Sequence, residues 1–218
     1  MSIQTSAPAP FRDVIETADD LMALYGPPED VVVAKVIDRL DRHCRDFIAR
    51  APFVLVGSVS ASGRCDVSPK GGAPGFVHVL DEHRLAIPDA PGNRLIDSLR
   101  NVRETGRAGL LFLIPGLEET LRVNGRAWLT RDPEIIERFG GEKKPPRVAI
   151  GVEVEEAFLH CAKAFKRSGL WRPDDWPELD GLARPAVIWK DHMKLAEMTL
   201  EELEEFVAKD YADNLEWK

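Results

Sequence analysis

Apolar and polar positions follow two different periods along this chain. Over residues 28–48 apolar residues recur every three or four positions and charged residues fill the gaps, which predicts one long amphipathic helix. From Phe53 the period shortens to two, and runs rich in β-branched residues are separated by turn residues. We therefore expect residues 53–60 and 64–68 to pair as one hairpin, and residues 76–80 and 84–88 to pair as a second.

Two alternating segments and one apolar run complete the predicted strands. Residues 121–129 and 148–154 alternate apolar with polar side chains, as half-buried strands do, and 109–114 is an apolar run of buried-strand length. About six or seven strands joined mostly by short turns predict an α+β, mainly β fold built as an antiparallel barrel. A parallel sheet would need more crossover helices.

Helix starts are marked by side chains that can cap exposed backbone N–H groups. These predicted caps are Thr17 with Asp20, Asp132 before Pro133, and Thr199 with Glu202. Another helix is expected to start after residues 89–92 and to end near Asn101, with Leu95, Ile96 and Leu99 on its inner side. Helices thus stand at the start, middle and end of the predicted barrel.

Charge and composition narrow the classes of function. In 218 residues, 29 Lys plus Arg against 37 Asp plus Glu give a net charge of −8, which argues against nucleic acid as the main partner. No apolar run approaches the roughly 18 residues of a membrane span, and residues 1–10 do not resemble a signal peptide. We therefore expect a cytoplasmic protein with no membrane partner.

The cysteines and histidines do not predict a metal site. Cys44, Cys65 and Cys161 are widely separated and form no CxxC motif, so they are expected to be reduced, buried thiols. The histidines lack the spacing of metal ligands. Cys161 follows His160 directly, but adjacent side chains point apart, which argues against a thiol nucleophile with its base.

Three segments carry more glycine, proline and charge than simple connections need. In the first, residues 68–75, glycines allow the backbone to approach a flat ligand, and Lys70 would place a cation at the edge of that ligand. The alternative is a wide hairpin loop without a ligand. The spacing matches neither a Walker A loop nor GxGxxG.

The second segment, residues 87–94, runs from a strand end to the predicted helix start. Free N–H groups and the helix dipole at such a place favour a phosphate, and Arg94 would add a bidentate cation. The alternative is that Asp89 only caps the helix and that Arg94 is solvated.

The third segment, residues 160–171, reverses the acidic character of the chain. It combines a histidine and a tryptophan with three cations, a composition that suits an anionic, aromatic ligand. These residues are His160, Lys163, Lys166, Arg167 and Trp171. An ordinary solvated helix face is the alternative.

The order of these segments resembles the flavin-binding split-barrel proteins of the pyridoxamine 5'-phosphate oxidase class, in particular a bacterial subgroup without assigned substrates. Five segments, which span residues 50 to 171, carry the resemblance. They are Asp66-Val67-Ser68-Pro69-Lys70-Gly71-Gly72, Ile87-Pro88-Asp89 through Pro91-Gly92-Asn93-Arg94, Asp97-Ser98-Leu99 with Asn101, Glu119 to Ala127, and His160-Cys161 with Lys163-Ala164-Phe165, Arg167-Ser168 and Leu170-Trp171.

The resemblance implies a six-stranded split barrel and a homodimer with FMN at two sites across the dimer interface. The stretch along the isoalloxazine falls on residues 72–77, helped by Ser68, Pro69, Lys70 and Gly71. The family's phosphate-binding arginine and lysine fall on Asn93 and Arg94, next to Asp89, so one cation is retained. Lys70 or Arg122 is a candidate for the missing charge, because a phosphate usually attracts more than one cation or several N–H donors.

Further site residues also follow from the resemblance. Positions that contact the flavin in the oxidases fall on Thr120 and His160, and those that bind their substrate fall near Lys166 and Ser168, where the oxidase signature is not reproduced. Pyridoxamine phosphate is therefore not the expected substrate. The implied organisation is an N-terminal arm and helices over 1–50 that pack on the barrel, the FMN-binding barrel over 51–171, and a C-terminal extension over 172–218.

The function expected on these grounds is FMN-dependent oxidation or reduction of an unidentified small molecule. The cofactor would carry the hydride or electron, so no side chain is assigned as a catalytic acid or base. The mouth of the site is expected at Lys163, Lys166, Arg167, Ser168 and Trp171. The alternatives are a protein that stores or senses flavin, haem or a deazaflavin without turnover and, less favoured, a true pyridoxamine 5'-phosphate oxidase.

Overall fold

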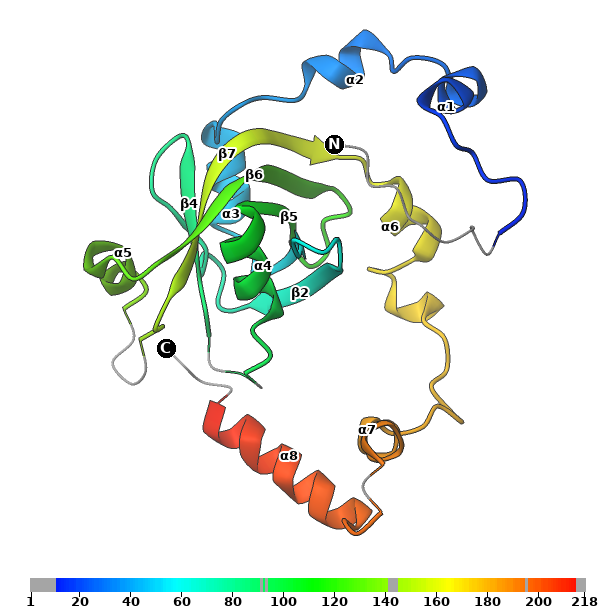
Figure 1. Cartoon of the computed structure of the whole chain (residues 1–218), viewed down its shortest axis with the longest axis vertical. Helices are drawn as coiled ribbons and strands as arrows, with labels where there is room; N and C mark the ends of the chain where they lie inside the picture. Colours follow the sequence, from blue (N-terminus) through cyan, green and yellow to red (C-terminus); the bar gives the residue numbers. More distant parts are fainter. Residues whose placement is uncertain (1–10, 91, 93, 141–144, 195, 215–218) are drawn as a thin grey trace. The chain divides into compact units, whose positions relative to one another are not determined.

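The computed structural model describes residues 11–90, 92, 94–140, 145–194 and 196–214, shown in Figure 1. The chain divides into two compact units, residues 1–36 and residues 37–218. The first unit contains helices α1 (Ala18–Tyr25) and α2 (Asp30–Ala34). The predicted cap on α1 is confirmed, since the Thr17 hydroxyl accepts from the Asp20 N–H at 3.1 Å. The second unit contains the sheet and the remaining helices.

The prediction of one helix over residues 28–48 is wrong. Helix α2 ends at Ala34, and α3 (Arg42–Ile48) begins afresh after Asp41, whose side chain accepts from the Cys44 N–H at 2.8 Å. Between them Ile37 forms an antiparallel bridge with Ala157, with N–H···O distances of 3.0 and 2.7 Å. Backbone pairing with the sheet therefore overrides helical periodicity, and Asp41 supplies the new N-cap.

Seven antiparallel strands form one sheet in the order β2-β1-β5-β6-β7-β4-β3. They are β1 (Phe53–Val59), β2 (Cys65–Gly71), β3 (His78–Val79), β4 (Arg84–Pro88), β5 (Arg107–Leu113), β6 (Thr120–Thr130) and β7 (Ala149–His160). Both predicted hairpins and the antiparallel α+β class are confirmed. The alternation predicts six or seven strands and the resemblance implies six, whereas the described sheet has seven. The additional one is β3, which has two residues and pairs only with β4 among the described residues.

The sheet curves strongly because the strands at its two edges are joined by a short connection. Residues 72–77 link the end of β2 to the start of β3, at the other edge of the sheet. Such a link reaches at most about 25 Å when fully extended, whereas seven flat strands span about 29 Å. A flat sheet is therefore impossible. No hydrogen-bonded ladder between β2 and β3 is seen in the described part of the chain.

One face of the curved sheet encloses the hydrophobic core. Alternate residues of five strands are buried there, as the period of two predicts, and helix α3 adds Cys44 and Ile48. The buried strand residues are Val54, Val56, Leu85, Ile87, Leu110, Phe112, Leu121, Val123, Ile150 and Val152. Burying a side chain of this size contributes about 1.5–3 kcal/mol, so these positions provide much of the driving force for folding.

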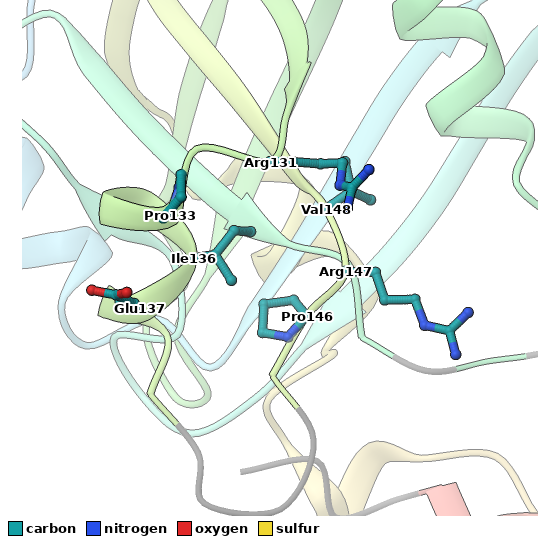
Figure 2. Close-up of a pocket in the computed structure, with 7 residues that line it drawn as sticks. All are labelled: Arg131, Pro133, Ile136, Glu137, Pro146, Arg147 and Val148. Atoms are coloured by element: carbon teal, nitrogen blue, oxygen red, sulfur yellow. The ribbon is translucent and has the colours of Figure 1, made fainter.

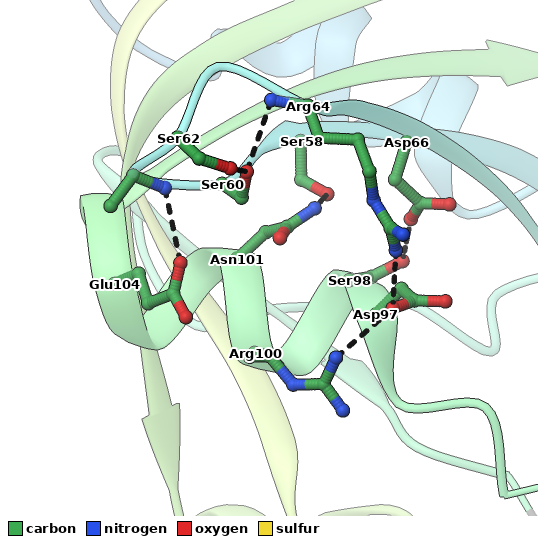
Figure 3. A network of polar contacts seen from close by, with 11 residues as sticks. Ser58, Ser60, Ser62, Arg64, Asp66, Asp97, Ser98, Arg100, Asn101 and Glu104 are labelled. Atoms are coloured by element: carbon green, nitrogen blue, oxygen red, sulfur yellow. Dashed lines mark hydrogen bonds and ion pairs between the residues drawn. The ribbon is translucent and has the colours of Figure 1, made fainter.

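Helix α4 (Asp97–Thr105) is fixed to the β1–β2 hairpin by polar contacts, seen in Figure 3. Asn101 donates to the Ser58 hydroxyl at 3.0 Å, and Ser98 donates to the Asp66 carboxylate at 2.7 Å. Both helix side chains are buried, so these hydrogen bonds satisfy groups that would otherwise be costly to bury. The expected inward position of Leu95 and Ile96 is wrong, because both precede the helix and are exposed.

The other helices are short, apart from the last. Helix α5 (Pro133–Arg138) starts at the predicted cap Asp132 and contributes to a second, small apolar cluster with Ala86, Phe139 and Ala149. The C-terminal part contains α6 (Lys163–Ser168), η1 (Pro173–Asp175), α7 (Pro185–Met193) and α8 (Leu200–Asn214). The predicted capping box of α8 is confirmed by hydrogen bonds of 2.8 and 3.1 Å between Thr199 and Glu202. None of the described helices is long and apolar enough to cross a bilayer.

The bulge between Asn124 and Gly125 of β6 provides a test of the sheet geometry. A Cβ atom on Gly125 would lie 1.9 Å from the Glu153 carbonyl oxygen of β7, whereas one on Gly151 would be 3.9 Å from its nearest neighbour. We expect Gly125→Ala to lower the free energy of unfolding by about 2–4 kcal/mol, and the matched control Gly151→Ala to change it by less than about 1 kcal/mol. Urea denaturation measures both, and equal effects would contradict this register.

Candidate functional site

Strand β2 presents three of its polar side chains on one face. Asp66, Ser68 and Lys70 are partly buried and alternate with exposed residues. Because the strand continues to Gly71, the expected loop over residues 68–75 is wrong for its first four residues, which pair with β1. Pairing makes Ser68 and Lys70 part of a rigid strand rather than of a wide loop.

Lys70 meets Asp89, so two residues predicted for the site come together. The Lys70 Nζ atom lies 3.5 Å from the Asp89 carboxylate, and the side chains are only 20% and 27% exposed. Asp89 immediately follows β4, and its N–H donates to the Val148 carbonyl at 3.0 Å. Lys70 belongs to an edge strand and Asp89 follows the second strand from the other edge, so curvature of the sheet makes this ion pair possible.

The outer edge of β2 carries a short row of backbone hydrogen-bonding groups. The Gly72 N–H donates to the Pro52 carbonyl, and the Arg64 carbonyl accepts from the Ser60 N–H, so the backbone groups of residues 64 and 72 face β1. In the alternating antiparallel pattern the N–H groups of Val67 and Gly71 therefore face outward. Pro69, between them, has no N–H, which is the usual place for proline on an edge strand. This edge can donate to, and accept from, a flat polar ligand.

Gly72 is explained by packing. A Cβ atom there would lie 2.7 Å from the Cβ of Phe76, which is buried in the core. The glycine thus allows the chain to pass over Phe76, a reason that sequence reasoning missed when it assigned the segment to a ligand. Its N–H donates to the Pro52 carbonyl at 3.0 Å.

The expected phosphate site at a helix start is not built as predicted. Helix α4 begins at Asp97 with Ile96 as its N-cap, so Asp89 does not cap it and Arg94 lies before it. Arg94 has a left-handed backbone with φ of 63°. Asn93 lies outside the described residues. Lys70 forms the ion pair with Asp89, and Ser68 lies on the same face of β2 as Lys70.

Thr120 and His160, predicted from the resemblance, are cross-strand partners. Thr120 begins β6 and is buried, and His160 ends β7 directly opposite. The guanidinium of Arg122 lies 5.4 Å from the centre of the Phe158 ring, and that ring lies 6.2 Å from the His160 ring. In this chain β2 is separated from β6 by β1 and β5, a distance of about 14 Å at the usual strand spacing.

The predicted mouth is divided between paired and exposed side chains. Lys166 forms an ion pair with Glu118 at 3.4 Å, Trp171 donates to the Leu117 carbonyl at 2.9 Å, and Ser168 donates to the Phe165 carbonyl at 3.2 Å. The contacts of Lys166 and Trp171 attach α6 and the residues after it to the turn before β6, whereas that of Ser168 lies within α6. Lys163 and Arg167 are exposed, which leaves them accessible to a ligand.

Sequence reasoning missed a pocket beside the Asp89 end of β7. Figure 2 shows its walls, which include Ile136, Val148, Arg131 and Arg147. The arginines stand just after β6 and just before β7, and Thr130 and Ala149 are partners in the ladder. Only their common position at strand ends could have signalled the site, and that signal is weak without the strand register.

These features define an antiparallel sheet protein with flanking helices. Lys70 on one edge strand and Asp89, after the second strand from the other edge, form a half-buried ion pair. A sequence model of the pyridoxamine 5'-phosphate oxidase family matches residues 40–161, more than half of the chain. The chain belongs to that family. No curated protein matches it.

The solved structures that match this chain have low sequence identity to it. Group A Streptococcus HupZ is 16% identical over 55% of this chain and 92% of its own, with a TM-score of 0.46. A protein from Lactobacillus delbrueckii described as a putative pyridoxamine 5'-phosphate oxidase is 19% identical over 56% and 95%, with a TM-score of 0.44. HutZ of Vibrio cholerae, described as a haem storage protein, is 14% identical over 56% and 94%, with a TM-score of 0.40. Similarities of this size do not decide which ligand binds.

The cysteines differ from the prediction in their burial. Cys44 is buried in the core, but Cys65 and Cys161 are exposed. Burial, with the hydrogen bond to Asp41 and the charge of that carboxylate, raises the pKa of the Cys44 thiol to about 11. Cys44 therefore stays protonated at neutral pH, and it is the least reactive of the three thiols.

This difference predicts selective modification. At pH 8 a disulfide reagent should react rapidly with Cys65 and Cys161 and reach Cys44 only after unfolding, and Cys44→Ala should remove only the slow phase. Rapid reaction of all three thiols in the native protein would contradict the burial of Cys44.

Because folding raises the pKa of Cys44 above its ordinary value of 9.0, the stability linked to Cys44 is complete below pH 9 and is lost as the pH rises through about 11.

Proposed function

We propose that this protein is an FMN-dependent oxidoreductase that acts on a small molecule. The observation that carries the proposal is its membership of the pyridoxamine 5'-phosphate oxidase family, established over residues 40–161. The donor set around β2 fits such a cofactor: an edge of backbone donors and acceptors for a flat heteroaromatic ring, and Lys70 with Ser68 for an anionic tail. FMN, when bound, supplies the hydride or electron chemistry.

In this scheme the residues of the chain bind FMN and its substrate and orient them. The outward N–H groups of Val67 and Gly71 would face the ring, while Lys70, Ser68 and Arg94 would hold the phosphate. The ion pair with Asp89 holds the Lys70 ammonium in place and offsets part of its charge. Thr120, Arg122 and His160 would contact the flavin from the β6–β7 end, and Lys163 and Arg167 would attract an anionic substrate.

We also propose a homodimer. The residues assigned to FMN on β2 lie apart from those on β6 and β7, and this separation supports it. Within one chain β1 and β5 lie between β2 and β6, so a second copy offers a way for both groups to reach one flavin. Val67 on the edge strand and Leu95 before α4 are 64% and 75% exposed, as expected of apolar residues that a partner covers. Light scattering that finds only monomers in the presence of bound FMN would contradict the dimer.

The Lys70–Asp89 pair provides a test in which the two variants should act in opposite directions. Lys70→Met should weaken FMN binding about tenfold or more, because a charge-assisted contact with the phosphate contributes roughly 1.5–3 kcal/mol. Asp89→Asn should strengthen binding, because it removes a negative charge near the phosphate while keeping the shape of the side chain. Quenching of FMN fluorescence on titration measures both.

The control is Glu153→Gln, which alters the exposed ion pair with Arg126 and should leave FMN affinity unchanged. If both pair variants weaken FMN binding equally, the pair only supports the fold and does not contact the phosphate. If the wild-type protein does not bind FMN, the proposed function itself is wrong, and a binding role for haem or another planar anion becomes the interpretation to test.

A further inference from the structure

The pocket at the start of β7 contains none of the residues assigned to the flavin, although Val148 in its wall accepts a hydrogen bond from the Asp89 N–H. It has a volume of about 670 Å³ and is lined by Arg131, Pro133, Ile136, Glu137, Pro146, Arg147 and Val148 (Figure 2). This volume lies in the range of small-molecule sites, about 300–1,000 Å³. None of the seven residues was assigned to FMN or to its substrate, so the pocket has no role in the proposed function.

The walls of the pocket divide into an apolar part and a cationic part. Ile136 and Pro133 of α5, with Pro146 and Val148 before β7, provide apolar surface. Arg131 and Arg147 extend to the same side, away from α5, as Figure 2 shows. Both arginines are exposed, and among the described residues neither guanidinium lies within ion-pair distance of a carboxylate. Their charges are therefore available to a ligand.

The position of the two arginines concentrates positive charge in a chain with a net charge of −8. Thr130 pairs with Ala149 in the sheet, so Arg131, one residue beyond Thr130, lies opposite Val148, next to Arg147. Two guanidinium groups near one cavity match a doubly charged phosphate better than a single carboxylate, because each planar fork can donate two hydrogen bonds. The apolar walls match an uncharged organic body.

We propose that this pocket binds a phosphomonoester with an apolar body. Arg131 and Arg147 would hold the phosphate at the rim, and Ile136 and Val148 would contact the apolar part. Glu137 also lines the pocket, but its carboxylate points away from the two arginines in Figure 2, so no ligand contact is assigned to it. The proposal does not require that FMN be bound.

The test uses phenyl phosphate as the probe and isothermal titration calorimetry on the full chain. We expect phenyl phosphate to bind at least about tenfold more tightly than either inorganic phosphate or phenol, because only the first offers both the charge and the apolar ring. Arg131→Met and Arg147→Met should each weaken that binding about tenfold. Arg138→Met, at the end of α5 and outside the pocket lining, is the matched control and should leave that binding unchanged.

A second titration, in the presence of saturating FMN, separates this site from the proposed flavin phosphate site. A separate pocket is supported if saturating FMN leaves the binding of phenyl phosphate undiminished and if the Arg131→Met and Arg147→Met variants lose that binding. If FMN displaces phenyl phosphate, and if Lys70→Met abolishes its binding while Arg131→Met and Arg147→Met do not, the phosphate binds beside Lys70 and the proposal is overturned. Absence of phenyl phosphate binding to the wild-type chain, or equal loss in Arg138→Met, would also overturn it.

Discussion

The short connection between β2 and β3 constrains the rest of this molecule. Six residues join strands that lie at opposite edges of a seven-stranded sheet, so the sheet cannot lie flat and has to curve. Curvature encloses the core on one face and brings Lys70 to Asp89. Gly72 and Phe76 make the connection possible, because the backbone passes so close to the Phe76 ring that only glycine fits. The candidate site thus exists as a consequence of how the sheet closes on its core.

Polar groups fix the elements that border this site. Helix α4 buries Ser98 and Asn101 together with the apolar Val102, and each of the two polar residues makes a hydrogen bond to a strand residue of the β1–β2 hairpin (Figure 3). Buried hydrogen bonds of this kind favour one relative position of helix and strand, since displacement would leave the buried groups unsatisfied. Asp66 in that network and Lys70 in the ion pair lie on the same face of β2. Strand β2 is therefore held at both ends of the face that we assign to the cofactor.

Local signals in the sequence predicted the elements better than their contacts. The hairpins, the antiparallel class and the caps at Thr17, Asp132 and Thr199 follow from alternation and from capping chemistry, and both act within a few residues. The helix expected over residues 28–48 failed because the bridge from Ile37 to Ala157 depends on a strand more than a hundred residues away. Cys65 is exposed for a similar reason, since its place on the edge strand β2 is decided by the order of strands, whereas Cys161 lies just after the end of β7.

The candidate site was predictable as a set of residues but not as an arrangement. Lys70 and Asp89 were both identified from composition and resemblance, yet their ion pair depends on the curvature of the sheet. Lys166 and Trp171 were read as the mouth of a ligand site, and the structure gives both of them partners on the turn before β6. Arg131 and Arg147 carried no motif, and only the pairing of β6 with β7 places them at one pocket.

The central claim, that this chain binds FMN and uses it for electron transfer, is tested most directly by the absorption spectrum of the purified protein. The released chromophore is identified by chromatography, and NADH or NADPH is then added without oxygen. We expect oxidised-flavin bands, FMN in equimolar amount to the chain, and bleaching on reduction followed by recovery with an electron acceptor. A colourless protein that does not quench added FMN fluorescence, or a haem spectrum in its place, would contradict it.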